Sequence, residues 1–135
     1  MFLLDTNIVI PVLNESNPKL ARRLDVELER GTPILLSAIV LYELRFGIAN
    51  SAQPARNRAA LMQFMTMPLE LLRFDEEDAD HAADIRAFLK RRARPIGPYD
   101  ILIAAQARRH GAALVTLNRR EFERVPGLIV TDWAA

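Results

Sequence analysis

The sequence predicts an α/β protein, a three-layer α/β/α sandwich built around a central, mostly parallel sheet. Short, continuous apolar runs recur along the chain, as in strands that are buried on both faces. Helical patterns separate these runs, which favours parallel strands joined by helical crossovers. The 135 residues, of which 50% are hydrophobic, can bury one core and are too few for a second domain. We therefore expect residues 1–135 to form a single domain.

Five apolar runs are the expected strands. The first covers residues 2–4 and ends at Asp5, so the polar residues Asp5, Thr6 and Asn7 are expected at the carboxyl end of a buried parallel strand. The other four runs cover residues 33–36, 69–74, 113–117 and 128–130.

Helical patterns fill the segments between these strands. Ser37 can cap a helix over residues 38–49, and Gly111 can end the helix that begins near Pro98. Pro11 conflicts with a helix that begins at Asn7, because proline is tolerated only in the first helical turn. The remaining helices are expected between Pro18 and Gly31, around Leu61, Phe64 and Met65 before Pro68, and behind a cap at Asp75, with Ala82, Ile85 and Leu89 turned inward.

Composition limits the function classes. With 18 basic and 17 acidic residues the net charge is +1, so any contact with nucleic acid must come from a local patch. The absence of cysteine excludes disulfides and thiolate zinc sites, and two histidines argue against a histidine-rich metal site. The apolar start, residues 2–13, has no basic leader and is too short to span a bilayer, which predicts a cytoplasmic protein without a membrane segment.

Asp5 and Asn118 both directly follow expected strands. Ligands of an open parallel sheet gather at the carboxyl ends of its strands, so both side chains are candidates for a site. Asp5 could instead be a turn residue with Asn7 as a helix cap, and Asn118 could cap a short helix over residues 119–124. Cap and site roles are compatible with each other.

Glu43 and Asp100 lie on expected helices. Apolar residues surround Glu43 on almost every face of its helix, and an ionised carboxylate there is costly unless a cation or strong donors receive it. An ion pair or an exposed position are the alternatives. Asp100 stands in the first turn of an apolar helix, where a negative charge is favourable in itself. From that position it would also point toward the carboxyl edge of the sheet.

Three converging carboxylates without histidine or cysteine form an oxygen-only site, which selects Mg²⁺ or Mn²⁺. These ions keep several waters and accept phosphate oxygens, so the expected substrate is a phosphoester that a metal-oriented water hydrolyses. Crowded like charges should leave the metal-free site strained and responsive to metal.

Four segments in order cover the chain: Leu3-Leu4-Asp5-Thr6-Asn7, residues 37–47 around Glu43, Ile96-Gly97-Pro98-Tyr99-Asp100, and residues 114–128 with Asn118. Together they resemble the PIN-domain ribonucleases, specifically the VapC-type toxins of toxin–antitoxin pairs. The chain departs from many of these relatives at Arg91-Arg92-Ala93-Arg94-Pro95, where they have a glycine-containing turn.

The resemblance implies a PIN-like fold and an endoribonuclease that uses Mg²⁺ or Mn²⁺ to hydrolyse RNA phosphodiester bonds. It implies Asp5, Glu43 and Asp100 as metal-holding carboxylates and Asn118 as a fourth catalytic position. Transfer RNA is a candidate substrate, a small cognate antitoxin protein the expected partner, and a homodimer the expected assembly. The supporting residues that it implies are Thr6, Thr116 and Glu121.

The densest basic run, Lys90, Arg91, Arg92 and Arg94, precedes the Asp100 motif. It is either a solvated helix end, where cations are favourable, or a contact for the RNA backbone.

Two rival functions start from the same residues. A phosphoacceptor or a phosphatase of the haloacid type would also carry an aspartate after the first strand. Asn7 stands where that phosphatase needs a second aspartate, and the only lysines are Lys19 and Lys90. The non-enzymatic alternative is a catalytically silent PIN-like module that binds RNA or protein.

Overall fold

The computed structural model describes residues 1–133 and contains one five-stranded sheet in the order β3-β2-β1-β4-β5. Every neighbouring pair of strands is parallel. The predicted α/β class and all five expected strands are confirmed. The strands are β1 (Phe2–Leu4), β2 (Ile34–Ser37), β3 (Glu70–Leu72), β4 (Ala113–Val115) and β5 (Ile129–Thr131).

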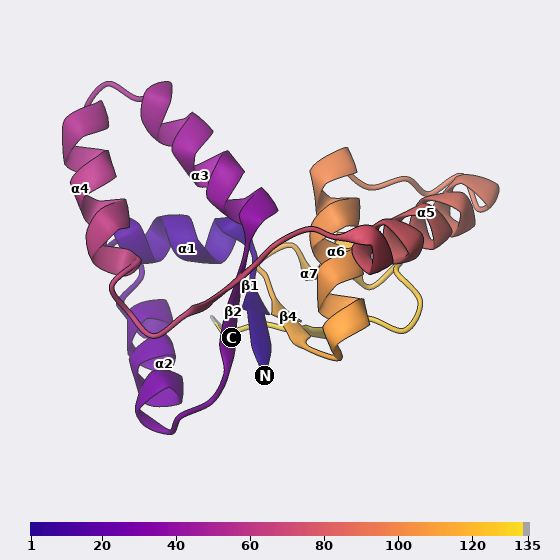
Figure 1. Ribbon diagram of the computed structural model, residues 1–135, viewed down its shortest axis with the longest axis horizontal. Helices are drawn as coiled ribbons and strands as arrows, with labels where there is room; N and C mark the ends of the chain where they lie inside the picture. The colour runs from indigo at the N-terminus through magenta and orange to yellow at the C-terminus, as the bar shows by residue number, and fades with distance from the viewer. Residues whose placement is uncertain (134–135) are drawn as a thin grey trace.

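Helices cover both faces of the sheet, with α1 to α4 on one side and α5 to α7 on the other (Figure 1). The chain moves outward from β1 to β2 and β3, and then returns to β4 and β5 on the other side. Right-handed crossovers place the helices of the two halves on opposite faces. The helices are α1 (Thr6–Leu13), α2 (Pro18–Glu29), α3 (Ala38–Ala49), α4 (Pro54–Phe64), α5 (Glu76–Arg91), α6 (Pro98–His110) and α7 (Arg119–Phe122).

Helix boundaries follow the expected caps. The Ser37 hydroxyl accepts a hydrogen bond from the Ile39 amide at 2.9 Å, and Gly111 ends α6 with a left-handed φ of 64°. Asp75 forms a capping box at the start of α5.

Helix α1 differs from the prediction. It begins directly after Asp5, whose carboxylate accepts from the Thr6 amide, so Asn7 lies inside the helix and is not its cap. Pro11 lies in the body of α1 and not in its first turn. Proline there removes one backbone donor, which costs little in a helix that ends at Leu13, because only the Asn7 carbonyl loses its helical partner.

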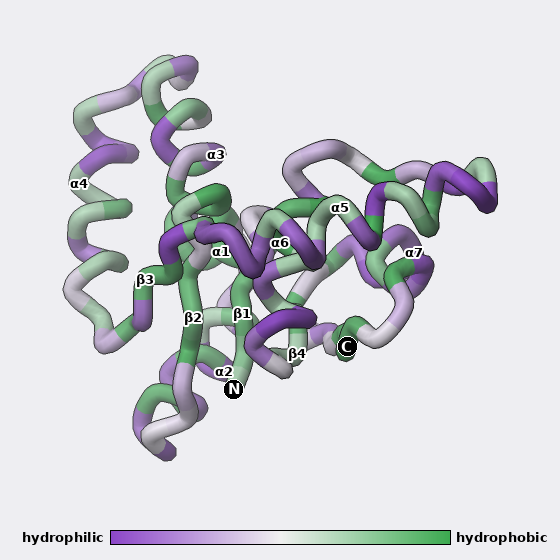
Figure 2. The backbone as a smooth tube through the Cα atoms, turned by 45° about the vertical axis from the view of Figure 1, so that its right-hand side comes forward, coloured by the Kyte–Doolittle hydropathy of each residue, from purple (hydrophilic) through white to green (hydrophobic). Residues whose placement is uncertain are grey.

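The centre of the sheet is fully enclosed. Leu3, Leu36 and Leu114 are each 0% exposed, on β1, β2 and β4. Figure 2 shows the hydrophobic colour along β1 and β2, as expected for central strands that are covered on both faces. No helix within residues 1–133 is long and apolar enough to cross a membrane.

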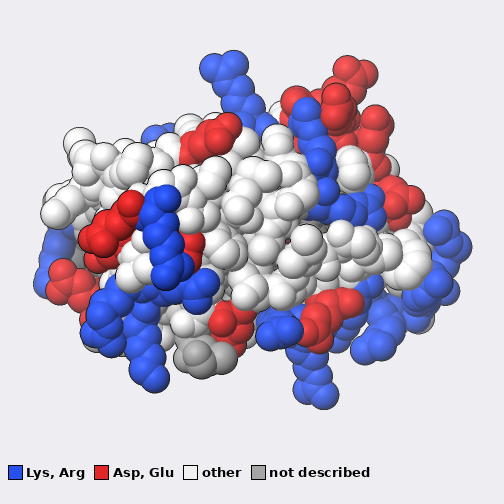
Figure 3. Space-filling model, turned by 90° about the horizontal axis from the view of Figure 1, so that it is seen from below, with Lys and Arg blue, Asp and Glu red and all other residues white. Residues whose placement is uncertain are grey.

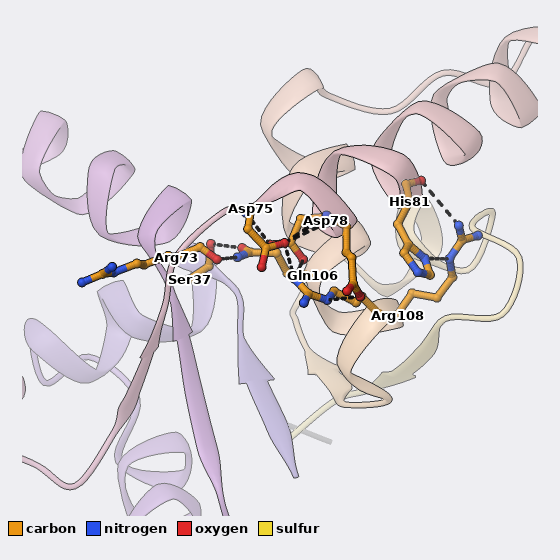
Figure 4. A network of polar contacts seen from close by, with 9 residues as sticks. Ser37, Arg73, Asp75, Asp78, His81, Gln106 and Arg108 are labelled. Atoms are coloured by element: carbon orange, nitrogen blue, oxygen red, sulfur yellow. Dashed lines mark hydrogen bonds and ion pairs between the residues drawn. The ribbon is translucent and has the colours of Figure 1, made fainter.

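A buried glutamine links the two helical layers through the sheet (Figure 4). Gln106 of α6 accepts a hydrogen bond from the Ser37 hydroxyl and donates to the Arg73 carbonyl at 3.1 Å. Ser37 ends β2 and caps α3, so this contact fixes α6 relative to α3. On the outer side of α6, Arg108 donates to His81 Nδ1 of α5 at 3.0 Å.

Candidate active site

Asp5 lies at the point where the strand order reverses. β1 pairs with β2 on one side and with β4 on the other, and ligand sites of open parallel sheets form at the carboxyl ends of such strands. Asp5 is 4% exposed. Its Oδ1 accepts from the Thr6 amide at 2.8 Å, and its Oδ2 accepts from the Thr116 hydroxyl at 2.8 Å. Burial raises the pKa of Asp5, the two hydrogen bonds partly offset that rise, and nearby Glu43 adds to it.

Glu43 is joined to Asp5 through one residue. The Thr6 hydroxyl donates to Glu43 Oε1 at 2.8 Å, while the amide of the same threonine donates to Asp5. The structure therefore brings these two carboxylates together across α1 and α3.

The sequence singled out Glu43 because its carboxylate was expected to be buried among apolar side chains, and that expectation is wrong. Glu43 is only half-buried, because α3 is not covered on every face: Tyr42 beside it is 50% exposed and Phe46 is 61% exposed. An apolar sequence around a carboxylate does not bury that carboxylate when the apolar side chains themselves face solvent. The strongest burial falls on Asp5.

Asp100 occupies the first turn of α6, as expected, and is half-buried. Within residues 1–133 it accepts no hydrogen bond and forms no ion pair. Its carboxylate lies close to Gly97, where a Cβ atom would come within 3.1 Å of Oδ2.

Desolvation is the main reason that the pKa of Asp100 rises from its usual 3.8 to about 6, and the charges of Asp5, Glu43 and Glu121 raise it further. The favourable effect of a helix N-terminus on a negative charge is outweighed here. The carboxylates of Asp5, Glu43 and Glu121 are thus all within electrostatic reach of Asp100.

Asn118 and Glu121 complete this edge of the site. Asn118 stands at the start of α7, but its side chain makes no capping hydrogen bond, so the expected capping role is wrong. Its Nδ2 instead donates to Glu121 Oε2 at 2.9 Å, and its backbone amide donates to the Thr116 hydroxyl oxygen at 2.9 Å. Thr116 therefore connects Asp5 to the segment that carries Asn118. Helix α7 is also shorter than predicted and ends at Phe122.

The donor set fits a hard divalent cation. None of the ion pairs found within residues 1–133 involves Asp5, Glu43, Asp100 or Glu121. Within the same residues no group of three or more His, Asp or Glu side chains is arranged so that it could by itself hold a metal ion. Mg²⁺ needs no such set, since it is commonly held by one or two carboxylates together with waters and substrate phosphates. The buried carboxylate of Asp5 and the half-buried ones of Glu43 and Asp100, which form no ion pair within residues 1–133, are the feature that a cation would neutralise.

The predicted basic run lies at the C-terminal end of α5, at the tip of the molecule, from which the chain returns to α6 (Figure 1). All four side chains are exposed. The Arg92 guanidinium lies 3.6 Å from the centre of the Phe88 ring. Seen from below, Lys and Arg lie beside Asp and Glu at both ends of the molecule (Figure 3), so this face carries no continuous basic surface.

Two further residues position the site through contacts that the sequence did not predict. Asn7 Oδ1 accepts from the Leu117 amide at 3.1 Å and so ties α1 to the end of β4. Gln106 fixes α6, which carries Asp100. Gln106 directly follows the apolar run 101–105, so a buried polar side chain could have been predicted there. The contact of Asn7 with Leu117 could not have been predicted, because it joins residues far apart in the chain.

Comparison with known proteins gives matches along nearly the whole chain. The family model described as PIN domain matches residues 2–128. The tRNA(fMet)-specific endonuclease VapC of Salmonella typhimurium is 39% identical over 132 residues, which cover 98% of this chain and 97% of that protein. Ribonuclease VapC2 of Rickettsia felis is 33% identical over 133 residues, 98% of each chain.

Solved structures agree with this. A chain in the crystal structure of VapBC2 from Rickettsia felis bound to a DNA fragment from its promoter superposes with a TM-score of 0.92, at 32% identity and 98% coverage of both chains. A chain of the DNA-bound VapBC from Salmonella typhimurium gives a TM-score of 0.89 at 39% identity, covering 98% of this chain and 97% of that one. The chain therefore belongs to the PIN-domain family and, within it, to the VapC proteins.

Proposed function

We propose that the protein is a divalent-metal-dependent endoribonuclease that hydrolyses RNA phosphodiester bonds and acts as the toxin of a toxin–antitoxin pair. The observation that carries the proposal is the group of uncompensated carboxylates at the carboxyl edge of the sheet. Asp5 is buried, Asp100 is half-buried with a pKa of about 6, and neither has a cationic partner among residues 1–133. Burying such carboxylates without a partner destabilises the folded protein, and a bound cation that also accepts a phosphoester oxygen would offset this cost.

Asp5, Glu43 and Asp100 are the residues that would hold Mg²⁺ or Mn²⁺. When bound, the ion supplies an acidified water as nucleophile and offsets charge that develops on the leaving oxygen. Thr6 and Thr116 hold Asp5 and Glu43 in fixed orientations through hydrogen bonds of 2.8 Å each.

Asn118 and Glu121 form the far edge of the proposed site. The Asn118 amide adds no charge, and its hydrogen bond to Glu121 keeps that carboxylate at the edge of the cluster. Both residues are positioned to orient water around the ion.

We further propose transfer RNA as the substrate, because similar VapC proteins carry the name tRNA(fMet)-specific endonuclease. The matched solved structures are VapBC toxin–antitoxin complexes. This supports a small antitoxin protein as partner of this chain, and we propose that it acts as a homodimer.

The catalytic test uses purified, partner-free protein, tRNA, and either Mg²⁺ or Mn²⁺. Asp100→Asn keeps the shape of the side chain and removes the charge. We expect it to lower cleavage by more than about 100-fold, since even outer-shell residues of metal sites contribute about 10- to 100-fold. Glu29→Gln, an exposed carboxylate on α2, is the matched control and should cleave normally. Equal cleavage by wild type and a folded Asp100→Asn variant would refute the assignment, and RNA binding without any cleavage would favour the silent module.

Toxicity needs its own test, because an active nuclease need not be a toxin. Expression of the wild type should arrest growth, and expression of Asp100→Asn should not. Co-expression of the proposed cognate antitoxin should relieve the arrest. Normal growth of cells that contain active protein would refute the toxin role.

A further inference from the structure

The Thr116 hydroxyl connects Asp5 to the neighbouring chain segments at the proposed site. Thr116 is 0% exposed, so its hydroxyl depends on partners inside the protein. A hydroxyl offers one proton and two acceptor lone pairs. The proton is donated to Asp5 Oδ2 at 2.8 Å, and one lone pair accepts from the Asn118 amide at 2.9 Å. One lone pair is left, and only a donor can satisfy it.

The carboxamide of Asn7 is the third neighbour of this hydroxyl. Its Nδ2 and its Oδ1 each lie 3.4 Å from Thr116 Oγ1. The Leu117 amide decides which of the two atoms serves the hydroxyl, because it donates to Asn7 Oδ1 at 3.1 Å. A reversed carboxamide would set an N–H donor against the Leu117 N–H. Oδ1 therefore serves Leu117, and Nδ2 is the donor that faces Thr116.

An amide at position 7 keeps the hydroxyl proton on Asp5. If an acceptor replaced Nδ2, it would compete with Asp5 Oδ2 for the one proton that the Thr116 hydroxyl has. Asparagine and aspartate have nearly the same shape, and both keep an oxygen for the Leu117 amide. The network therefore depends on the donor group of Asn7 and not only on the size of its side chain.

We propose that Asn7 is a positioning residue of the proposed site: its carboxamide directs the Thr116 hydroxyl proton to Asp5 and so fixes the Asp5 carboxylate in the orientation that would hold the metal ion. The inference rests on the proposed ribonuclease function and adds how one metal-holding carboxylate is kept in place. The other Asp5 oxygen accepts from the Thr6 amide at 2.8 Å, so both carboxylate oxygens are held. Partners that orient metal ligands contribute about 10- to 100-fold to metal affinity or activity.

A simpler role for Asn7 is that of a tie between α1 and the end of β4. The contact with Leu117 provides this tie by itself, and a carboxylate of the same length would provide it equally well. The two roles give opposite expectations for Asn7→Asp. This change keeps the acceptor for Leu117 and turns the donor that faces Thr116 into an acceptor.

The test compares Asn7→Asp with Asn7→Ala, which also removes the tie. Each change is made in the wild type and together with Thr116→Val, which has no hydroxyl. Asn17→Asp, at the N-cap of α2, is the control, because it adds the same charge and keeps an acceptor for the Leu20 amide.

Three measurements separate the roles. Mn²⁺ binding without RNA is measured at pH 7.5 from the electron paramagnetic resonance signal of the free ion. Hydrogen exchange of the Leu117 amide, followed by NMR in EDTA, reports the tie. Cleavage of tRNA is measured at saturating Mn²⁺.

We expect Asn7→Asp to leave the Leu117 amide as protected as in the wild type, yet to weaken Mn²⁺ binding about 10-fold and to lower kcat about 10-fold, with KM within about 2-fold. The added negative charge alone would favour a cation, so weaker binding identifies the lost orientation of Asp5. Asn7→Ala should lose the protection and about 10-fold in Mn²⁺ affinity. With Thr116→Val already present, neither change should weaken Mn²⁺ binding by more than about 2-fold, and Asn17→Asp should resemble the wild type.

Other results would overturn the proposal. If Asn7→Asp cleaves RNA and binds Mn²⁺ like the wild type, or binds the ion more tightly, Asn7 does not act through the hydroxyl proton, and the ribonuclease function stands. If the changes at Asn7 weaken Mn²⁺ binding equally with and without the Thr116 hydroxyl, their effect does not pass through Thr116. If circular dichroism shows that Asn7→Asp does not fold, Asn7→Ala decides by the same comparison. If the wild type neither binds Mn²⁺ nor cleaves RNA, the proposed function itself fails and the inference fails with it.

Discussion

Asp100→Asn should stabilise the metal-free protein at neutral pH. The pKa of Asp100 rises from 3.8 to about 6 in the folded protein, because of its burial and of the charges of Asp5, Glu43 and Glu121. One pKa unit corresponds to about 1.4 kcal/mol, so the full shift would amount to about 3 kcal/mol, and solvent screening of this half-buried side chain reduces the cost of the ionised carboxylate to about 1–2 kcal/mol. Asparagine keeps part of the desolvation cost, which leaves an expected gain of about 0.5–1.5 kcal/mol in the free energy of unfolding.

The sign of this effect depends on pH. Because the folded pKa of Asp100 lies above the unfolded one, the folded state binds the proton more tightly, and the cost grows as pH rises from about 4 to about 6. Above that range the cost is constant. The advantage of Asp100→Asn should therefore be present at pH 7.5 and absent near pH 4.

Thermal unfolding, followed by circular dichroism in EDTA, measures this gain. We expect Tm to rise by about 2–6 °C at pH 7.5, since a domain of this size changes by a few degrees per kcal/mol. Glu29→Gln, at an exposed carboxylate, should leave Tm unchanged. Mn²⁺ should raise the Tm of the wild type more than that of Asp100→Asn. A lower Tm for Asp100→Asn at pH 7.5, or the same gain at both pH values, would show that repulsion and burial do not act on this carboxylate.

Three further changes test the structure around the site. Thr116→Val removes a donor to a buried carboxylate and should cost about 1–3 kcal/mol of stability and most cleavage activity, whereas Thr131→Val on β5 should leave cleavage unchanged; normal cleavage by Thr116→Val would contradict its positioning role. Ala93 has a φ of 53°, in the left-handed region, so Ala93→Gly should raise the free energy of unfolding by about 1 kcal/mol, while Ala87→Gly inside α5 should lower it by about the same amount; a loss at both positions in urea unfolding would contradict the strain at Ala93. Gln106→Leu breaks the link between α6 and β2 and should lower stability by about 1–3 kcal/mol; unchanged urea unfolding would contradict that role.

Local patterns determined the elements of this protein. The continuous apolar run before Asp5, the cap at Ser37 and the glycine at 111 each act through neighbouring residues, so they can be recognised without a fold. All five strands lie where such signals place them. Pro11 was misjudged because its cost depends on how soon the helix ends.

The candidate site was only partly contained in the sequence. The residues next to Asp5 show that it follows a buried parallel strand, which places its side chain at the carboxyl edge of the sheet. That Thr116 reaches Asp5 follows from the pairing of β4 with β1, a contact between residues far apart in the chain. The hydrophobic pattern of a segment predicts that it forms a strand, but it does not predict which other strand pairs with it.

Burial, too, was decided only by the tertiary structure. The apolar sequence around Glu43 favoured its burial, yet Glu43 is half-buried, Asp5 is buried, and Asp100 carries the largest rise in pKa. Desolvation depends on side chains that other elements bring near, and so does the charge that each carboxylate meets. The sequence by itself determined the helices, the strands and the residues of the acidic set; the packing of α3, α6 and β4 around β1 decided which of those carboxylates most needs a cation.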